Sequence, residues 1–406
     1  MNNTTTESVS GSFAFKSRTY RRFLYGSFFV RTSDWMDLTI LNWIVYDWTQ
    51  SAVALGILNG CRLLPVFFFS LFAGSIADRF NRKKSLQFIH TGLFLTTLFI
   101  AFVISEGNST ITLMTIVTLK SILMSFEVPI RNAYLSDIVS IDMLGSAVTL
   151  QTTIINVARM IGPAAAGLLL TYYPAGDILL LISIGPLIGL LTLWGMSDAR
   201  KADKERKLSQ KKTVKETLVY MNSQPVLVSI VLLSIAPMVL GFPYTTMLPV
   251  LAGELMEIGP DGFGLLLSVS SVGAIVSTAV LAWKQPRNGG KWLILSSLGF
   301  GTSLVLFTVF SDYYLLAYLF MFLVGFVSQF YRTLNRIMVQ MKVAEEYRGR
   351  VLSIVLMDRG YIPLGAIMVG FVANSFGAHS AGIFMGAGTI VLTISILRSN
   401  RRLWKE

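Results

Sequence analysis

The chain has 406 residues, of which 53% are hydrophobic and only 14% are charged, and its formal net charge at pH 7 is +12. Soluble proteins carry about a quarter of charged residues, so this composition excludes an ordinary soluble enzyme or binding domain and is typical of a membrane protein. The single cysteine, Cys61, lies in an apolar run, which excludes a disulfide or a cysteine-based metal site within one chain.

Apolar runs of about twenty residues recur along the whole chain, and each is long enough to cross a hydrocarbon core of about 30 Å. The first 22 residues are polar and then basic and lack the features of a secretory signal, so we expect the first helix to direct its own insertion. The runs predict twelve transmembrane helices, at residues 23–46, 53–77, 84–104, 110–133, 144–172, 178–196, 225–252, 262–283, 292–310, 313–339, 349–374 and 378–398. We therefore predict an all-α polytopic membrane protein.

The positions of lysine and arginine test this helix count, because cytoplasmic loops retain positive charge and translocated loops avoid it. All but five of the 34 lysines and arginines fall on one side of the predicted arrangement, and the loops of the opposite side hold none. The five exceptions lie inside predicted helices and are Arg31, Arg62, Lys120, Arg159 and Arg359. The pattern predicts that both chain ends are cytoplasmic, and it explains the basic charge without nucleic-acid binding.

A basic interval in the middle of the chain predicts a cytoplasmic linker between two six-helix bundles. The predicted parts are a tail (1–22), the N-terminal bundle (23–196), the linker (197–224), the C-terminal bundle (225–398) and a second tail (399–406). An internal repeat supports this division, because Arg159 and Pro163 in the fifth helix recur as Arg359 and Pro363 in the eleventh. Many secondary transporters place their substrate site between two such repeats.

The loop after the second predicted helix carries a recognisable motif. Gly74, Asp78, Arg79 and Arg82 stand in the run GSIADRFNRKK, which resembles the major facilitator superfamily signature between helices two and three. The flanking runs SDWMDLTILNWIVYDWTQ and FEVPIRNAYLSDIV are similar to the drug:proton antiporter clade that holds macrolide efflux proteins and enterobactin-type siderophore exporters. The likeness covers most of the first half, and it implies the major facilitator fold and a proton-driven exporter that works by alternating access.

Two positions depart from the family pattern. Asn81 stands where the signature usually has glycine, and we expect it to adopt the same turn conformation. In the corresponding loop of the second half, Trp283 takes the place of the acid, so we expect that half to lack the same charge lock.

The resemblance also implies a conformational latch, in which Asp78 and Arg82 contact an acid of helix four and the start of helix eleven. Glu127 matches the role of the helix-four acid. The residues of this expected latch are Gly74, Asp78, Arg79, Arg82, Glu127 and Arg131. The alternative, charges that only set the topology, suits Lys83 and Lys84 better than Asp78.

Asp34 lies near the middle of the first predicted helix, with Arg31 and Asp37 each three residues away and thus on neighbouring faces. An ionisable group at this depth is costly and is a candidate for function. Burial favours the neutral acid and a nearby cation favours the carboxylate, so a conformational change can switch its protonation. We predict that Asp34, with Asp37, couples transport to protons; the alternative is a permanent ion pair of Asp34 with Arg31 or Arg159.

Other charges are expected in the cavity. In this superfamily helix four lines the cavity, and Lys120 lies near its middle. We expect Lys120 and Arg159 to pair with Asp34 when it is ionised and to hold an anionic substrate group in the other state. Asp358 and Arg359 are adjacent, and since neighbours in a helix do not face each other, each is expected to pair elsewhere.

No run matches a phosphate-binding loop, so an ion gradient is the expected energy source. Proton-coupled export of a small amphipathic molecule, such as a siderophore or a macrolide, is the preferred function, and ion-coupled import of a nutrient is the alternative. A membrane enzyme or receptor is disfavoured, because His90 and His379 lack catalytic or metal-like spacing and are expected to fill the core and a loop. An excess of buried cations over acids favours an anionic substrate.

The expected partners are a small-molecule substrate, protons and the lipid bilayer, with no cofactor, metal or nucleic acid. We expect a monomer in the bacterial cytoplasmic membrane.

Overall fold

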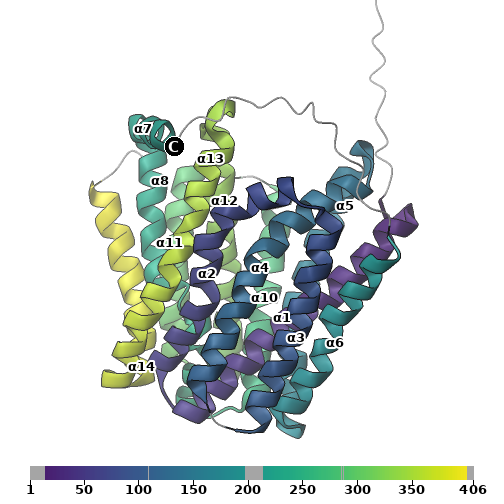
Figure 1. The fold of residues 1–406 in the computed structure, drawn as a ribbon. Coiled ribbons are helices and arrows are strands. Elements are labelled where there is room, and N and C mark those ends of the chain that lie inside the picture. The colour runs from purple at the N-terminus through teal and green to yellow at the C-terminus, as the bar shows by residue number, and fades with distance from the viewer. Residues whose placement is uncertain (1–13, 108, 197–213, 285, 287, 400–406) are drawn as a thin grey trace, which may run out of the picture.

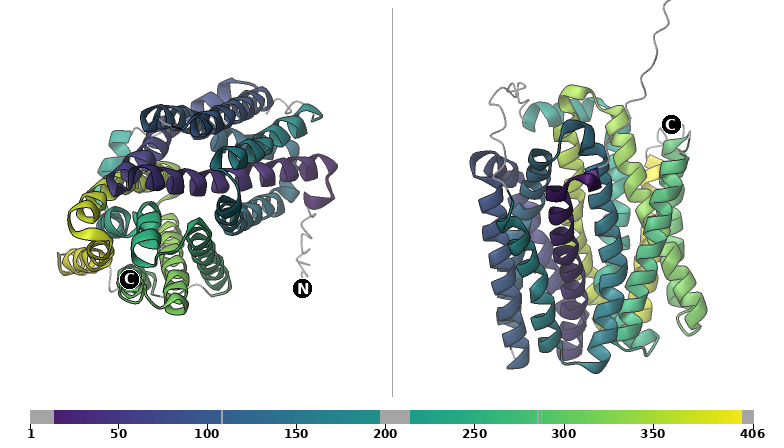
Figure 2. Two further views of the ribbon diagram at one scale, coloured as in Figure 1. Left: turned by 90° about the horizontal axis from the view of Figure 1, so that it is seen from below. Right: turned by 90° about the vertical axis from the view of Figure 1, so that its right-hand side faces the viewer.

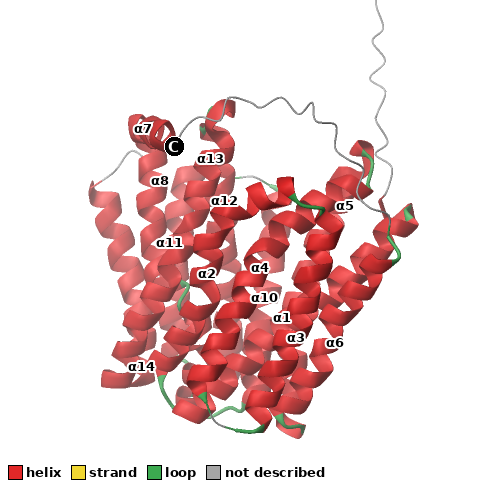
Figure 3. Ribbon diagram, in the orientation of Figure 1, coloured by secondary structure: helices red, strands yellow, loops and turns green. Residues whose placement is uncertain are grey.

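The computed structural model describes residues 14–107, 109–196, 214–284, 286 and 288–399. These residues form long helices joined by short loops (Figure 3). Ten helical stretches of the described chain are long and apolar enough to cross a membrane. They become the twelve predicted crossings once α1, whose middle carries three charged residues, is added and the long stretch α14 is divided at Gly377.

The N-terminal bundle holds six long helices in the order that the sequence predicts. They are α1 (Arg18–Thr49), α2 (Ala52–Arg79), α3 (Arg82–Ser105), α4 (Thr110–Ile138), α5 (Leu144–Tyr172) and α6 (Ala175–Trp194), with short turns η1 (Ala14–Lys16) and η2 (Ile141–Met143). Hydroxyl and amide side chains cap three of these helices: Ser17, Asn81 and Ser109 accept hydrogen bonds from backbone N–H groups three residues on.

Asn81 differs from its expected role as a substitute for a turn glycine. Its φ is −63° and its ψ is 113°, which is extended backbone, and its side chain accepts a hydrogen bond of 3.0 Å from the Lys84 N–H. The asparagine therefore serves as the N-cap of α3, a role in which asparagine stabilises a helix by about 1 kcal/mol relative to alanine.

The C-terminal bundle is less regular than the predicted helices. It holds α8 (Pro225–Ala236), η3 (Pro237–Gly241), α9 (Tyr244–Val250), η4 (Leu251–Leu255), α10 (Pro260–Trp283), α11 (Gly289–Val309), α12 (Tyr314–Lys342), α13 (Glu345–Leu356), η5 (Met357–Gly360) and α14 (Tyr361–Ser399). Gly377 has φ 82° and ψ 167°, a conformation open to glycine, and so divides α14 close to the predicted boundary between the last two helices.

The seventh crossing is broken where the sequence predicts one helix over residues 225–252. Its two wide turns, η3 and η4, are π-helical, and the Phe242 N–H donates to the Pro237 carbonyl at 2.8 Å, five residues back. Proline lacks an N–H and its ring clashes with the preceding turn, so Pro237, Pro243 and Pro249 explain why a regular α-helix cannot continue here.

The predicted linker contains a helix that the sequence analysis missed. Residues 197–213 lie outside the described part, but α7 (Val214–Ser223) follows them. The Tyr220 ring stacks on Tyr347 at a centroid distance of 4.2 Å, and the Tyr220 hydroxyl accepts a hydrogen bond of 3.0 Å from the Ala344 N–H. The end of the linker is thus attached to α13 and its preceding loop.

The two bundles lie side by side, and the beginning of α1 and the end of α14 lie at the same end of the molecule (Figures 1 and 2). We call this the terminal end. The bundles touch mainly through α5 with α10 and α2 with α14. A Cβ added at Gly167 would lie 2.3 Å from the Pro260 carbonyl oxygen, and one at Gly264 would lie 2.3 Å from that of Pro163.

These close approaches gather away from the terminal end. Trp43, near the far end of α1, stacks on Phe263 at 5.8 Å, and Gly56, near the start of α2, lies against the Ala366 backbone. A Cβ added at Gly253 of η4 would lie 2.7 Å from the Tyr46 hydroxyl oxygen. The bundles are therefore closed against each other at the end opposite the termini.

Candidate functional site

Four charged side chains from two helices form a buried network in the N-terminal bundle, which we call the Arg31 network: Arg31, Asp34, Glu127 and Arg131. One guanidinium nitrogen of Arg31, Nη1, lies 2.9 Å from Asp34 Oδ2, and the other, Nη2, contacts Glu127 Oε2. On the other side, Arg131 Nε lies 3.2 Å from Glu127 Oε1. Their spacings, three residues along α1 and four along α4, place each pair on one helix face.

This network is almost closed to solvent. The Glu127 side chain is 1% exposed, and those of Arg31, Asp34 and Arg131 are 10%, 12% and 7% exposed. Two cations face two carboxylates, so the network is neutral as a whole. Removing one partner from a buried ion pair costs about 3–5 kcal/mol because it leaves an uncompensated charge.

A second network forms around Asp37, which we call the Asp37 network: Asp37, Arg62, Lys120 and Thr97. Lys120 Nζ lies 2.8 Å from Asp37 Oδ1 and donates to the Thr97 hydroxyl at 2.9 Å. The other carboxylate oxygen, Oδ2, lies 3.3 Å from Arg62 Nη1. One carboxylate is thus shared by two cations, and its side chain is only 2% exposed.

The structure corrects the expected partner of Lys120. The sequence analysis paired Lys120 with Asp34, but Lys120 contacts Asp37, one turn farther from the terminal end. Asp34 pairs with Arg31, so of its two alternative ion pairs the one with Arg31 is present. Arg159 lies with its guanidinium carbon 5.6 Å from the centre of the Trp35 ring.

Of the expected latch residues, the structure describes the side chains of Arg82, Glu127 and Arg131. The side chains of residues 70–79, which include Gly74, Asp78 and Arg79, lie outside the described part of the structure. Arg82 pairs with Asp137 at 2.6 Å and donates to the Ala133 carbonyl at 3.3 Å. Glu127 belongs instead to the Arg31 network, because it lies about three turns closer to the middle of α4 than Asp137 does.

The expected charges of helix eleven are only partly described. Asp358 lies in η5 and lines a small cavity with Arg332, Arg336 and Asn335 of α12. The guanidinium of Arg332 lies 4.1 Å from the centre of the Phe242 ring, a cation–π contact. The side chain of Arg359 lies outside the described part, so its partner is not assigned.

Several polar residues of the site escaped sequence reasoning. Gln151 accepts a hydrogen bond of 3.1 Å from Arg131, and the Asn59 amide donates to Asn42 at 2.7 Å between α1 and α2. Asp137 and Thr97 likewise proved to be partners of basic residues. Each is a polar residue inside or at the edge of an apolar run, which is a usable signal, but the partner depends on how the helices pack.

Known proteins resemble this chain over almost its whole length. The sequence model of the family described as transmembrane secretion effector matches residues 10–406. The staphyloferrin A transporter of Staphylococcus aureus is 33% identical over 94% of this chain and 96% of its own length. Macrolide efflux protein A of Streptococcus pyogenes is 22% identical over 90% of this chain and 91% of its own length.

Solved structures share the fold at low sequence identity. A bacterial homologue of the human lysosomal transporter Spinster, in an inward-facing and unoccupied conformation, has a TM-score of 0.77, 13% identity, and coverage of 96% of this chain and 98% of its own. The nucleoside transporter NupG has a TM-score of 0.75 at 14% identity, over 94% of this chain and 99% of its own.

Proposed function

The chain belongs to the transmembrane secretion effector family of major facilitator transporters, and we propose that it is a proton-coupled exporter of a small anionic siderophore. The likeness to a staphyloferrin A transporter and to macrolide efflux proteins supports the substrate class and the outward direction. With the termini in the cytoplasm, as the lysines and arginines predict, contacts at the opposite end close the outer side of the transporter.

The observation that carries this proposal is the charge content of the N-terminal bundle. With the Arg82–Asp137 pair at the helix ends left aside, the described helix interiors hold five cations and three carboxylates, and Asp37 is shared between Arg62 and Lys120. Buried charge is costly unless it is compensated, so such a site favours a ligand that brings negative charge. The residues counted are Arg31, Arg62, Lys120, Arg131 and Arg159 against Asp34, Asp37 and Glu127.

The proton is assigned to the neutral Arg31 network. Arg31 holds Asp34 and Glu127 at once, so a proton on either carboxylate weakens one of its two contacts. A proton on Asp34 weakens the contact within α1, and a proton on Glu127 weakens the contact that joins α1 to α4. Asp34 is the more exposed of the two carboxylates, at 12% against 1%, and is therefore the better carrier.

The membrane potential favours export of an anion. One charge that crosses the membrane is worth about 2.3 kcal/mol per 100 mV. An anion that leaves a negative interior in exchange for one entering proton moves two charges in the favourable direction, about 4.6 kcal/mol per 100 mV. Since about 1.4 kcal/mol corresponds to a tenfold ratio, this supports a substrate gradient of about three decades.

A second candidate, proton-coupled uptake of an anion, is favoured by one contact. A proton on Asp37 would release Arg62 and Lys120 together, so a proton and an anionic substrate would bind in the same step. Such coupling carries both in one direction and would make the protein an importer.

Transport by everted membrane vesicles tests both candidates, with labelled staphyloferrin A and erythromycin as probes. Export predicts uptake of staphyloferrin A into everted vesicles, faster when the vesicle interior is acidic and electrically positive. Asp34→Asn should abolish the dependence on the pH gradient, whereas Asp47→Asn, an exposed acid of the same helix, should preserve it. Full gradient-driven uptake by Asp34→Asn contradicts the proton assignment, and accumulation only in right-side-out vesicles establishes the importer.

A further inference from the structure

His90 is the buried titratable group that the proposed mechanism does not use. It lies on α3, and 6% of its surface is exposed. Neither ring nitrogen makes a hydrogen bond of normal geometry to the described residues, although the Gly189 backbone lies close to the ring. A buried polar group without a hydrogen bond costs about 1–3 kcal/mol, so an apolar side chain would fill this position better.

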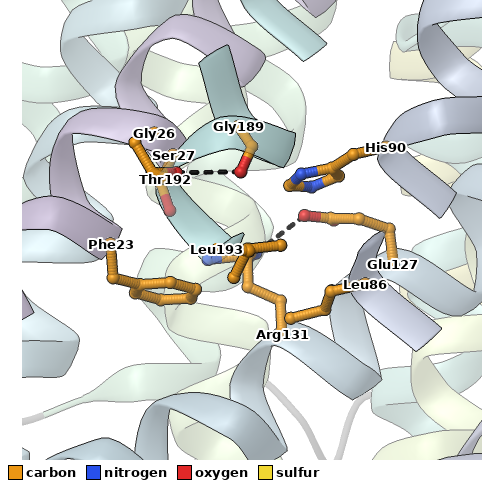
Figure 4. Close-up of a pocket in the computed structure, with 10 residues that line it drawn as sticks. All are labelled: Phe23, Gly26, Ser27, Leu86, His90, Glu127, Arg131, Gly189, Thr192 and Leu193. Atoms are coloured by element: carbon orange, nitrogen blue, oxygen red, sulfur yellow. Dashed lines mark hydrogen bonds and ion pairs between the residues drawn. The ribbon is translucent and has the colours of Figure 1, made fainter. Parts of the chain in front are cut away.

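The imidazole borders a small cavity between α1, α3, α4 and α6 (Figure 4). The cavity has a volume of about 10 Å³, which is room for one water molecule. Phe23, Leu86 and Leu193 contribute apolar side chains to its wall, and Figure 4 shows His90 and Glu127 next to each other.

The polar groups around this cavity match the needs of a bound water. The Glu127 carboxylate accepts hydrogen bonds, the Arg131 guanidinium donates, and the Ser27 hydroxyl does both. The Thr192 hydroxyl donates to the Gly189 carbonyl at 2.8 Å. Buried waters in proteins make about three hydrogen bonds, and the imidazole with the first three groups offers four partners, which is enough.

The ionisable groups near the cavity form a series with depth. At about 1.5 Å of rise per residue, His90 lies about 12 Å from the start of α3 at the terminal end. Glu127 lies about 16 Å from the corresponding end of α4, and Asp34 about 24 Å from the start of α1. By this measure His90 lies nearer the terminal surface than Glu127 and Asp34, at about the depth of Arg131.

We propose that His90 and a single water in this cavity form the proton exit between Glu127 and the terminal end of the bundle. This inference rests on the proposed proton coupling. In the transfer step a neutral Glu127 gives its proton to the water oxygen while the water gives one of its own protons to the His90 imidazole. The products are an imidazolium, an unchanged water and the Glu127 carboxylate, which again holds Arg31 and Arg131.

The charges that face His90 make the imidazolium a short-lived carrier. From α4 they are Glu127, which attracts it, and Arg131, which repels it; from α1 the charge is Arg31, which also repels it. The residues of α6 that line the cavity, Gly189, Thr192 and Leu193, carry no charge. Because the ring is also buried, which disfavours its charged form, the proton passes on to the terminal surface instead of resting on the ring.

The first test separates proton release from transport itself. In vesicles, His90→Gln should slow pH-driven export of staphyloferrin A at least tenfold, while substrate counterflow at equal pH, which needs no net proton movement, stays within twofold of the wild-type rate. His379→Gln is the matched control, because His379 is exposed and is the other of the two histidines. The proposal is overturned if His90→Gln preserves driven export, or if driven export and counterflow fall together.

The second test detects the hydrogen bond between the His90 ring and the water, in a protein whose cavity residues are unchanged. In the His379→Gln protein His90 is the only histidine, so its imidazole ¹⁵N spectrum is unambiguous. We expect one nitrogen with the chemical shift of a hydrogen-bonded acceptor, and a change of that shift in Glu127→Gln. Two nitrogens with shifts of an unbonded ring would refute the relay. Wild-type vesicles that show no response to a pH gradient would instead contradict the proposed function.

Discussion

The most direct consequence of the Arg31 network concerns Glu127, whose two oxygens face two different arginines. In Glu127→Gln the side chain keeps its size but loses its charge, so Arg31 retains one carboxylate and Arg131 retains the neutral amide of Gln151. Because the Glu127 side chain is 1% exposed, water cannot screen the charge that is left behind. We expect the free energy of unfolding to fall by about 3–5 kcal/mol.

Unfolding of the purified protein in detergent by denaturant measures this loss. Asp47→Asn is the control, because it neutralises an exposed acid of α1 and should change the unfolding free energy by less than about 0.5 kcal/mol. In Glu127→Gln/Arg131→Met the excess cation is removed as well, and since residues in one network are not additive, we expect the double variant to recover about 1–3 kcal/mol. Equal stability of Glu127→Gln and wild type, or no recovery in the double variant, would show that loss of the Glu127 charge does not leave an uncompensated positive charge in the network.

Three further substitutions test other parts of the molecule. Lys120→Met should weaken staphyloferrin A binding at least tenfold in an equilibrium binding assay, while Lys342→Met, an exposed lysine, should not; equal affinities would remove Lys120 from the substrate site. Gly167→Leu should force the closed end apart, because a Cβ there would lie 2.3 Å from the Pro260 carbonyl oxygen. Maleimide labelling of the single cysteine, the half-buried Cys61, should then become several-fold faster, and an unchanged labelling rate would contradict this. Gly377→Ala should lower the free energy of unfolding by about 1–3 kcal/mol, because φ is 82° there. Gly145→Ala, in open space at the start of α5, should lower it by less than about 1 kcal/mol, and equal losses in the two variants would argue against backbone strain.

The helices were predictable because a membrane crossing depends mostly on length and hydropathy, which the sequence displays directly. The exceptions lie where local chemistry intervenes. Three prolines turn the seventh crossing into α8, η3, α9 and η4, and their presence in residues 225–252 is visible, but the choice of π-helical turns depends on how the neighbouring backbone packs. The helix α7 is short and polar and gave no periodic apolar signal strong enough to predict it.

The sequence predicted which residues belong to the candidate site, but not which of their side chains contact each other. Arg31, Asp34, Asp37 and Lys120 stand out because charge is rare in apolar runs. Which of two aspartates a lysine contacts depends on the rotation of α1 against α4, and a difference of three residues, about one turn, decides it. For the same reason Glu127 was predicted at the terminal surface although it lies inside the bundle, and His90 was predicted as filler although its ring borders the cavity with Glu127.

The two networks differ in what they hold together, and this difference supplies a physical route from protonation to movement. The Arg31 network joins α1 to α4 within one bundle, so its protonation loosens a contact internal to that bundle. The Asp37 network includes Arg62 of α2, the helix that contacts α14 of the other bundle. A Cβ added at Gly60, two residues before Arg62, would lie 4.0 Å from the Pro363 side chain of α14. Arg62 therefore lies next to the interface between the bundles.

An anionic substrate that draws Arg62 and Lys120 away from Asp37 therefore acts on the helix that keeps the far end closed. A ligand shifts a conformational equilibrium only by its differential affinity for the two states, and this contact gives the substrate such a difference. In the mechanism proposed above, protonation at Asp34 acts on a neighbouring turn of the same helix α1, so the proton and the substrate would each bias the contact between the bundles through one helix.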